Sequence, residues 1–222
     1  VHPGDFKTTD LSLIEQVQDY VWSIGWWHTF SPSLVHRIDK ETSGIILIAK
    51  QKQLLMQLVS DFKTHKNIKK TYLVLVIWKL SRESGTIKKK LLRIEGAKNQ
   101  NKVQVSDTWQ NAVTHFKKIW EYIYDSFKEK IIISELSVEI ETGRMHQIRV
   151  HLAELWNPIL WDNKYGNKNL NWFFKKHYWI QRHMLHASDI EIYNNSTKQK
   201  MRFHAPVKTD MKNLIEKWIK NI

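Results

Sequence analysis

The stretch "TGRMHQIRVHLAELWNPILWDNKYG", residues 142–166, decides the fold of this chain. After the turn signal Thr142–Gly143, residues 145–155 have the pattern of a helix. Proline, Asx residues and glycine, which are typical of turns, then punctuate residues 157–166. The stretch therefore predicts a helix followed by a tight loop.

The polar residues of this stretch suit an anion better than a metal. His146 and His151 are five residues apart, whereas two zinc ligands on one helical face are four apart, and no glutamate lies between them as in H-E-x-x-H. We therefore expect no metal site here. Arg144 and Arg149 are better suited to pair with an acid or a phosphate.

The composition describes an ordinary globular chain with a strong positive charge. The 222 residues are 42% hydrophobic and 26% charged, and the longest apolar run, residues 72–78, is far too short for a bilayer. The absence of cysteine excludes disulfides and permits a reducing cytoplasm, and the polar first ten residues predict no signal peptide. A net charge of +13 indicates either a nucleic-acid partner or a basic solvated surface.

Hydrophobic periodicity predicts a mixture of helices and strands. Helices are expected at residues 11–22, with Asp10 as N-cap, and at 52–62, 145–155 and 210–222; strands are expected at 44–50, 70–78 and, with one wet face, 131–140. Residues 81–110 are polar and lysine-rich, which predicts a long hairpin or an insertion on the surface. No regular βαβ rhythm is present, so the α+β class is favoured.

Two further segments could carry chemistry. In "LVHRIDKETSGIILIAK", residues 34–50, the side chains of His36, Arg37 and Asp39 crowd ahead of an expected strand. They could form a reactive acid with its partners, or a turn in which Asp39 caps the backbone and Arg37 pairs with Glu41. In "KKTYLVLV", residues 69–76, Tyr72 could be a core residue or a ring that stacks on a base.

These segments resemble the motifs of the RluA family of RNA pseudouridine synthases. "HRIDKETSGIILIAK" is similar to that family's H-R-L-D-x-x-T-S-G signature, and "KTYLVLV" to its strand with an active-site tyrosine. Residues 142–166 resemble its T-G-R-x-H-Q-I-R-V-H-L segment followed by G-x-P-I-x-G-D-x-x-Y-G, and "MLHASDIEI" and "FHAP" resemble its late strand and closing proline. The motifs follow the family's order from about Pro32 to Pro206.

The resemblance implies a fold and an activity. We expect residues 1–222 to form a pseudouridine synthase catalytic domain, an α+β fold with a mixed, largely antiparallel sheet, flanking helices and a central active-site cleft. The expected reaction is isomerisation of chosen uridines in RNA to pseudouridine, without cofactor or metal. The segment 112–119, "AVTHFKKI", looks most like enzymes that act on 23S ribosomal RNA, with tRNA as the alternative substrate. A cytoplasmic monomer with no membrane partner is expected.

The family's functional residues carry over to matching positions here. Asp39 is the expected catalytic carboxylate, Arg149 its positive partner and Tyr72 the ring that stacks on the isomerising base. Arg37 would fill the gap left by the flipped nucleotide, and Ile148 would form an apolar wall. His36 and Arg144 complete the expected substrate-binding set, and Thr42 and Ser43 are expected to be turn residues that bond the backbone.

The sequence departs from the family in two ways. It begins at or inside the "VHPG" stretch, so an edge strand of the family is expected to be missing, and no N-terminal S4 RNA-binding domain is visible. It also has 11 tryptophans and only 7 glycines, where average usage predicts roughly 15 glycines. Five tryptophans replace glycines of the family's motifs or turns: Trp78, Trp109, Trp156, Trp161 and Trp179. Our hypothesis is that several are UGA codons that the organism reads as glycine; genuine tryptophan is the alternative.

Two other classes of protein compete with the enzyme. A catalytically silent RNA-binding module on the same fold would have no need to retain Asp39, Tyr72 and Arg149 together. A metal-dependent nuclease would need a carboxylate cluster, which we do not find in the sequence.

Overall fold

The computed structural model describes residues 11–25, 30–94, 102–125, 130–178, 180–194 and 198–219. Its residues group into two compact units, one made of residues 1–40 and 46–68 and the other of residues 41–45 and 69–222. Among the helices in these described ranges, none combines the length and apolarity that a membrane crossing requires.

The first unit contains two helices and a two-stranded antiparallel ladder. Helix α1 spans Leu13–Ser23 and α2 spans Lys52–Thr64, while β1 (Ser33–Leu34) pairs with β3 (Ile48–Ala49). Helix α1 begins with a capping box: the Ser12 hydroxyl accepts from the Glu15 amide, and the Glu15 carboxylate accepts from the Ser12 amide. The expected N-cap was therefore wrong, because Ser12 fills that position; Asp10 itself lies outside the described residues.

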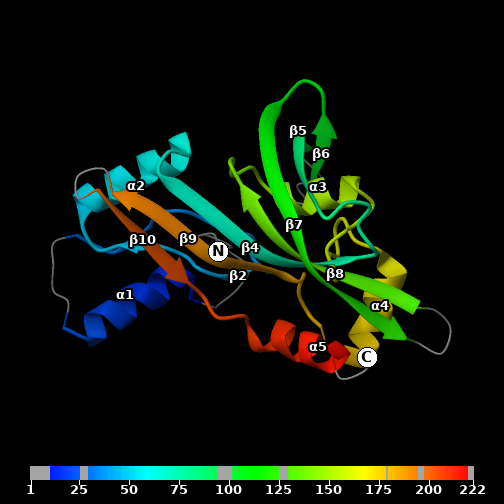
Figure 1. Cartoon of the computed structure of the whole chain (residues 1–222). Coiled ribbons are helices and arrows are strands. Elements are labelled where there is room, and N and C mark those ends of the chain that lie inside the picture. Colours follow the sequence, from blue (N-terminus) through cyan, green and yellow to red (C-terminus); the bar gives the residue numbers. More distant parts are fainter. Residues whose placement is uncertain are drawn as a thin grey trace. The chain divides into compact units, whose positions relative to one another are not determined.

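The second unit is built on one large sheet (Figure 1). Its strand order is β10-β9-β4-β8-β7-β5-β6, and the short strand β2 pairs in parallel with β9. The pairs β10–β9, β4–β8, β8–β7, β7–β5 and β5–β6 are antiparallel, which confirms the expected α+β fold with a largely antiparallel sheet. The strands are β2 (Ser43–Gly44), β4 (Ile68–Ile77), β5 (Ser84–Ile94), β6 (Lys102–Ser106), β7 (Gln110–Asp125), β8 (Lys130–Ile140), β9 (Leu185–Asn194) and β10 (Gln199–His204).

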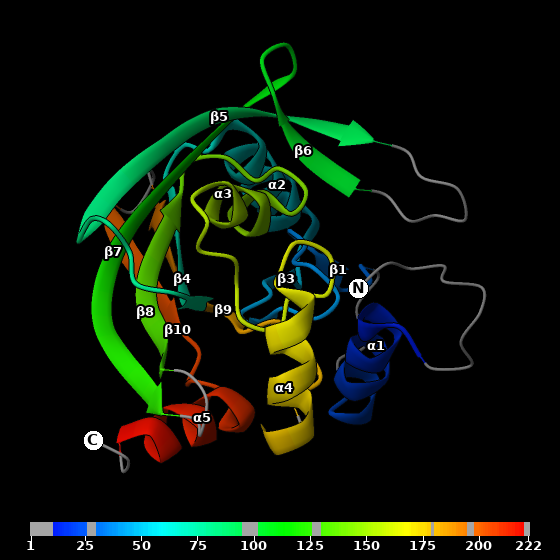
Figure 2. The ribbon, with the colours of Figure 1, turned by 90° about the vertical axis from the view of Figure 1, so that its right-hand side faces the viewer.

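Three helices pack on this sheet. Strands β5, β7 and β8 curve around α3 (Gln147–Glu154), as Figure 2 shows, and α3 contacts β5, β6 and β7. Helix α4 (Lys168–Tyr178) meets the end of β7, where Tyr124 contacts the rings of Phe173 and Phe174. Helix α5 (Thr209–Ile219) contacts β7 as well. The core centres on β4 and β8, where four consecutive residues of β4, Val74–Ile77, are fully buried.

Two sequence predictions need correction in detail. The strand expected at residues 44–50 is broken into β2 and β3, because Gly44 adopts a φ of +111° and the chain then leaves β9. The hairpin expected within residues 81–110 is present as β5 and β6. It is not a separate insertion, since β5 also pairs with β7 from Ser84 to Leu91.

Three tryptophans occupy backbone conformations that favour glycine. Trp78, Trp156 and Trp161 have φ values of 77°, 61° and 66°. At the end of α3, the Trp156 amide donates to Ala153 O (3.0 Å) and the Asn157 amide to Leu152 O (3.1 Å). This is a Schellman cap with tryptophan at the position where glycine is usual.

Replacing Trp156 by glycine tests this strain. A left-handed conformation costs a non-glycine residue about 1–2 kcal/mol, and the Trp156 side chain, 86% exposed, regains little through burial. We expect Trp156→Gly to raise the free energy of unfolding by about 1 kcal/mol in urea denaturation. Trp172→Gly is the matched control, because Trp172 is exposed within α4; it should lower stability by roughly 0.5 kcal/mol. A loss of stability in both variants would contradict the assignment of strain.

Candidate functional site

In the first unit, the segment after β1 carries His36, Arg37 and Asp39. The His36 ring stacks on Phe62, with centroids 4.5 Å apart, and its Nε2 accepts from the Leu47 amide at 3.0 Å. The contacts of His36 therefore hold this segment to α2 and to the residues before β3. Arg37 is exposed and Asp39 is half-buried just before the turn at residues 40–41.

In the second unit, the end of the same signature segment is docked on β9. The Thr42 hydroxyl hydrogen-bonds His183 Nε2 at 2.8 Å, and the Ser43 hydroxyl hydrogen-bonds His186 Nδ1 at 2.9 Å. The expected side-chain bonds of Thr42 and Ser43 to the backbone were wrong, because both hydroxyls bond imidazoles instead.

Glycine is required at the next position because of close backbone contact. A Cβ atom on Gly44 would lie 2.1 Å from Ala187 O and 2.6 Å from Ala187 N, and neither backbone atom can yield as a flexible side chain would. The φ of +111° would also strain any other residue at this position. Thr42, Ser43 and Gly44 of the signature segment therefore pack directly on β9 and the residues just before it, which form the late strand "MLHASDIEI"; this contact is called the joint below.

Tyr72 lies on β4, opposite Val138 of β8, and is partly buried against the main core. Lys70 precedes it by two residues and so lies on the same face of the strand. Burial lowers the pKa of Lys70 to about 8. The sequence carries no signal for this, because Lys70 belongs to a run of lysines that is typical of a solvated surface; in the structure Lys70 is only 7% exposed.

Helix α3 and the residues before it carry three of the predicted site residues in different surroundings. Ile148 is buried in the same core that Tyr72 packs against. Arg144, just before the helix, donates from Nε to Asn111 O of β7 at 3.2 Å. Arg149 is 7% exposed and makes a two-pronged pair with Asp162, Nε to Oδ2 at 2.7 Å and Nη2 to Oδ1 at 2.9 Å.

Gln147 joins the start of α3 to β7 and to the residues just before the helix through four hydrogen bonds. Its Oε1 accepts from the Thr142 hydroxyl (2.7 Å) and the Arg144 amide (3.0 Å), while its Nε2 donates to Val113 O (2.9 Å) and to the Thr114 hydroxyl (3.0 Å). All of these bonds are made by a side chain that is 3% exposed. A buried amide with its donors and acceptors used fixes the start of α3 against the sheet.

Asp162 occupies the aspartate position of the G-x-P-I-x-G-D-x-x-Y-G motif, and Glu41 lies in the signature segment, but neither was predicted as a site residue. Interaction with His183, whose Nδ1 is 3.4 Å from the Glu41 carboxylate, lowers the pKa of Glu41, and the positive charge of Arg149 adds to this effect. Across the described ranges, no group of three or more His, Asp or Glu side chains could hold a metal ion.

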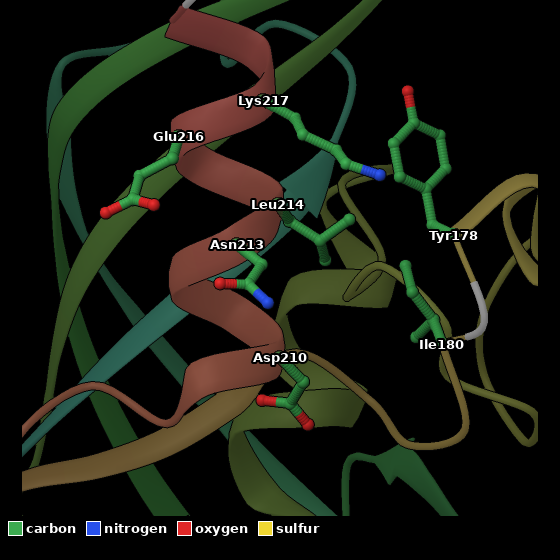
Figure 3. Close-up of a pocket in the computed structure, with 7 residues that line it drawn as sticks. All are labelled: Tyr178, Ile180, Asp210, Asn213, Leu214, Glu216 and Lys217. Carbon is green, nitrogen blue, oxygen red and sulfur yellow. The ribbon is translucent and has the colours of Figure 1, made fainter.

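The second unit contains a pocket that none of the residues described above lines. It is lined by the end of α4, Ile180 and one face of α5, as Figure 3 shows. Its Asp210 pairs with Arg182 through Nε–Oδ2 and Nη2–Oδ1 contacts of 2.7 and 2.8 Å, and Lys217 lies over the Tyr178 ring. Its polar groups therefore serve the packing of α5, and its seven lining residues include none of the predicted site residues.

Comparisons with known proteins agree with this fold. The chain is similar to the solved structure of human RNA pseudouridylate synthase domain containing 4, with a TM-score of 0.72 and 21% identity, covering 94% of this chain and 84% of that one. The solved structure of human RNA pseudouridylate synthase domain containing 1 gives a TM-score of 0.66 at 19% identity. The match covers 85% of this chain and 80% of that one. These structures define the class of fold.

The sequence comparisons define the family. The RNA pseudouridylate synthase family matches residues 27–154. Ribosomal large subunit pseudouridine synthase C of Buchnera aphidicola subsp. Baizongia pistaciae is 38% identical over 82% of this chain and 56% of that protein. The protein of the same name from Vibrio cholerae is 32% identical over 83% and 54%. The chain thus spans about half the length of the curated relatives it matches, and it belongs to the RNA pseudouridylate synthase family, as its motifs predicted.

The buried His151 should make stability depend on pH. Its Nδ1 hydrogen-bonds the Thr114 hydroxyl at 2.9 Å, and burial lowers its pKa to about 4. The unfolded chain takes up a proton near pH 6.5 whereas the folded protein does not. The stability that neutral, buried His151 allows is therefore fully present above about pH 6.5. As pH falls toward 4, the free energy of unfolding drops by about 2–3 kcal/mol from this residue.

Urea denaturation of His151→Gln between pH 7 and 5 measures this effect. The variant should lose stability less steeply than the unchanged protein. His177→Gln is the control, because His177 is exposed on α4, and it should keep the original slope. Equal slopes in the unchanged protein and His151→Gln would show that His151 is protonated in the folded state.

Proposed function

We propose that this protein isomerises specific uridines of large-subunit ribosomal RNA to pseudouridine. The observation that carries the proposal is the family match over residues 27–154, a span that includes Asp39, Tyr72 and Arg149 at the positions of the family's motifs. The substrate is inferred from the relatives whose names specify the large ribosomal subunit.

The reaction is balanced within the nucleotide. The N1–C1′ bond breaks, the base turns, C5 bonds to C1′, and the hydrogen of C5 leaves as a proton while N1 gains one. Asp39 acts as a carboxylate, either by adding to the sugar or ring or by removing a sugar proton, and in each case it must be ionised. Arg149 is the proposed source of the positive charge that keeps it so.

Tyr72 and Ile148 are proposed to receive the base. Tyrosine offers a flat apolar face with little acidity, so a base can stack on it and still rotate. Their shared core gives both side chains rigid support. The target uridine must leave its stack to react, which costs a few kcal/mol, and the planar guanidinium of Arg37 is suited to occupy the vacated space.

The basic surface is proposed to contact phosphates. Lys88, Lys89 and Lys90 are exposed on β5, and they belong to a chain with a net charge of +13. Phosphate contacts supply affinity and register rather than sequence choice. The affinity for RNA should therefore fall steeply with salt.

Replacement of the proposed catalytic carboxylate tests the activity. With ribosomal RNA carrying tritium at uridine C5, the unchanged protein should release tritium to water, and Asp39→Asn should release none, because the neutral amide can neither add nor take a proton. Asp19→Asn, at an exposed position of α1 outside every motif, is the matched control and should keep full activity. Release by Asp39→Asn at the unchanged rate would refute the role of Asp39.

The substrate needs a separate experiment. Pseudouridines mapped in cells with and without this gene should differ in large-subunit ribosomal RNA. A change confined to tRNA would identify the alternative substrate. An absence of tritium release from either RNA, together with retained RNA binding, would favour the silent binding module.

A further inference from the structure

Arg149, one of the proposed catalytic residues, forms a buried charge pair with Asp162. Asp162 is fully buried, and its two carboxylate oxygens take two parallel N–H donors of the guanidinium at 2.7 and 2.9 Å. The guanidinium also lies 5.2 Å from the centre of the Tyr165 ring. Asp162 binds one edge of the planar Arg149 guanidinium and the Tyr165 ring lies against its face, so the plane and direction of the guanidinium are fixed.

Asp162 is itself held by the loop that follows α3. Its Oδ1 accepts from the amides of Lys164 (2.9 Å) and Tyr165 (3.0 Å). Its backbone oxygen accepts from the Gly166 amide (2.8 Å) and from Asn171 Nδ2 (2.9 Å). The loop therefore holds the Asp162 carboxylate independently of its contacts with Arg149.

The loop tolerates little change at this point. A Cβ atom on Gly166 would approach Asp162 O to 2.3 Å. The Tyr165 hydroxyl hydrogen-bonds His146 Nδ1 at 2.8 Å and accepts from the Val103 amide at 2.9 Å, which ties the loop to the start of α3 and to β6. These contacts make residues 162–166 a rigid support rather than a connecting segment.

We propose that Asp162 is the positioning residue of Arg149: it fixes the plane and direction of the guanidinium that the reaction requires. This inference rests on the proposed function of the site. Arg149 stays charged at all working pH values, and Asp162 stays ionised with it. Burial alone would raise the pKa of Asp162, but the hydrogen bonds and charge of Arg149 outweigh burial and the net shift is downward.

The molecule supplies an internal control. Arg182 and Asp210 form a pair of the same two-pronged geometry, with distances of 2.7 and 2.8 Å, in the same unit. That pair ties α5 to the chain before β9, where Arg182 Nη1 also donates to His183 O and Leu185 O. Asp210→Asn therefore removes a comparable ion pair outside the proposed catalytic residues.

The test compares Asp162→Asn with Asp210→Asn well below their melting temperatures. Asp162→Asn should lower kcat for tritium release about 10–100-fold, by analogy with the losses found when the partner that orients a metal ligand is removed, while KM for RNA stays unchanged. Asp210→Asn should leave kcat unchanged. Equal kcat values for the two variants and the unchanged protein, or equal losses in both variants, would overturn the positioning role.

A second variant covers the case in which Asp162→Asn does not fold. Asp162→Glu keeps the charge but moves the oxygens, so it should lose kcat even where circular dichroism shows the native fold; full activity would overturn the proposal. An independent readout is the arginine Nε–H signal in nuclear magnetic resonance, where the Arg149 signal should lose its protection in Asp162→Asn and keep it in Asp210→Asn. If the unchanged protein releases no tritium, the proposed function fails, while this signal still reports whether Asp162 orients Arg149.

A different observation carries a second inference, about three tryptophans. Trp78, Trp156 and Trp161 have positive φ values, and they stand at glycine positions of the family's motifs. Trp161 follows Leu160 in a turn closed by the Asp162 amide on Ile159 O (3.1 Å), at the turn position where positive φ calls for glycine. Its indole is buried, yet Nε1 has no hydrogen-bond partner.

We infer that residues 78, 156 and 161 are glycines in the protein as its organism makes it, encoded by UGA. Trp22 and Trp172 lie in helices α1 and α4 and are outside the inference. Trp109 has no positive φ in its described turn, and Trp179 lies outside the described residues. The glycine deficit, 7 residues in 222, agrees with the direction of the change.

The gene and the native protein together decide this point. We expect UGA codons at the three positions, and peptides from the organism's own protein should have the mass of glycine there. UGG codons would overturn the inference, and so would tryptophan masses from UGA codons.

Discussion

The buried pair of Arg149 and Asp162 is the interaction on which the rest of the proposed catalytic apparatus depends. Two opposite charges inside a protein are costly to desolvate, and they are retained only where their geometry is excellent. Here the loop after α3 supplies that geometry through the amides of Lys164 and Tyr165 on one carboxylate oxygen, and Asn171 of α4 donates to the backbone oxygen of Asp162. Helix α3, which carries Arg149, and the loop that contains Asp162 are therefore held together as one unit. In the sequence they have different patterns, one helical and one typical of turns.

Much of the fold could be predicted from periodicity, and the failures have physical causes. Strands β4 and β8 and helices α3 and α5 are predictable because each has one continuous pattern of burial. Strand β7 is not, because a bulge between Lys118 and Trp120 interrupts its alternation. Helix α4 was also missed, although Asn167, which accepts from the amides of Asn169 and Leu170, is a readable N-cap signal.

For the site, motifs identified residues but not their partners. Both Arg149 and Asp162 stand at motif positions, but their pairing could not be predicted, because it depends on a loop that brings Asp162 back to a helix 13 residues earlier. The burial of Lys70 could not be predicted either, since burial of a charged side chain depends on strands distant in sequence. The family's glycine positions were the most informative local signal, because the backbone adopts positive φ at three of them, residues 78, 156 and 161.

The joint between the signature segment and β9 has a consequence for how the protein is made. Ser43 and His186 are separated by 143 residues. At position 44 only glycine leaves room for the backbone of Ala187. Contacts of such long range form slowly, and during synthesis they must wait for the later partner to emerge from the ribosome. Residues 43 and 44 thus acquire their anchor only after His186 and Ala187 have been synthesised, so that shorter nascent chains cannot fix the end of the signature segment in place.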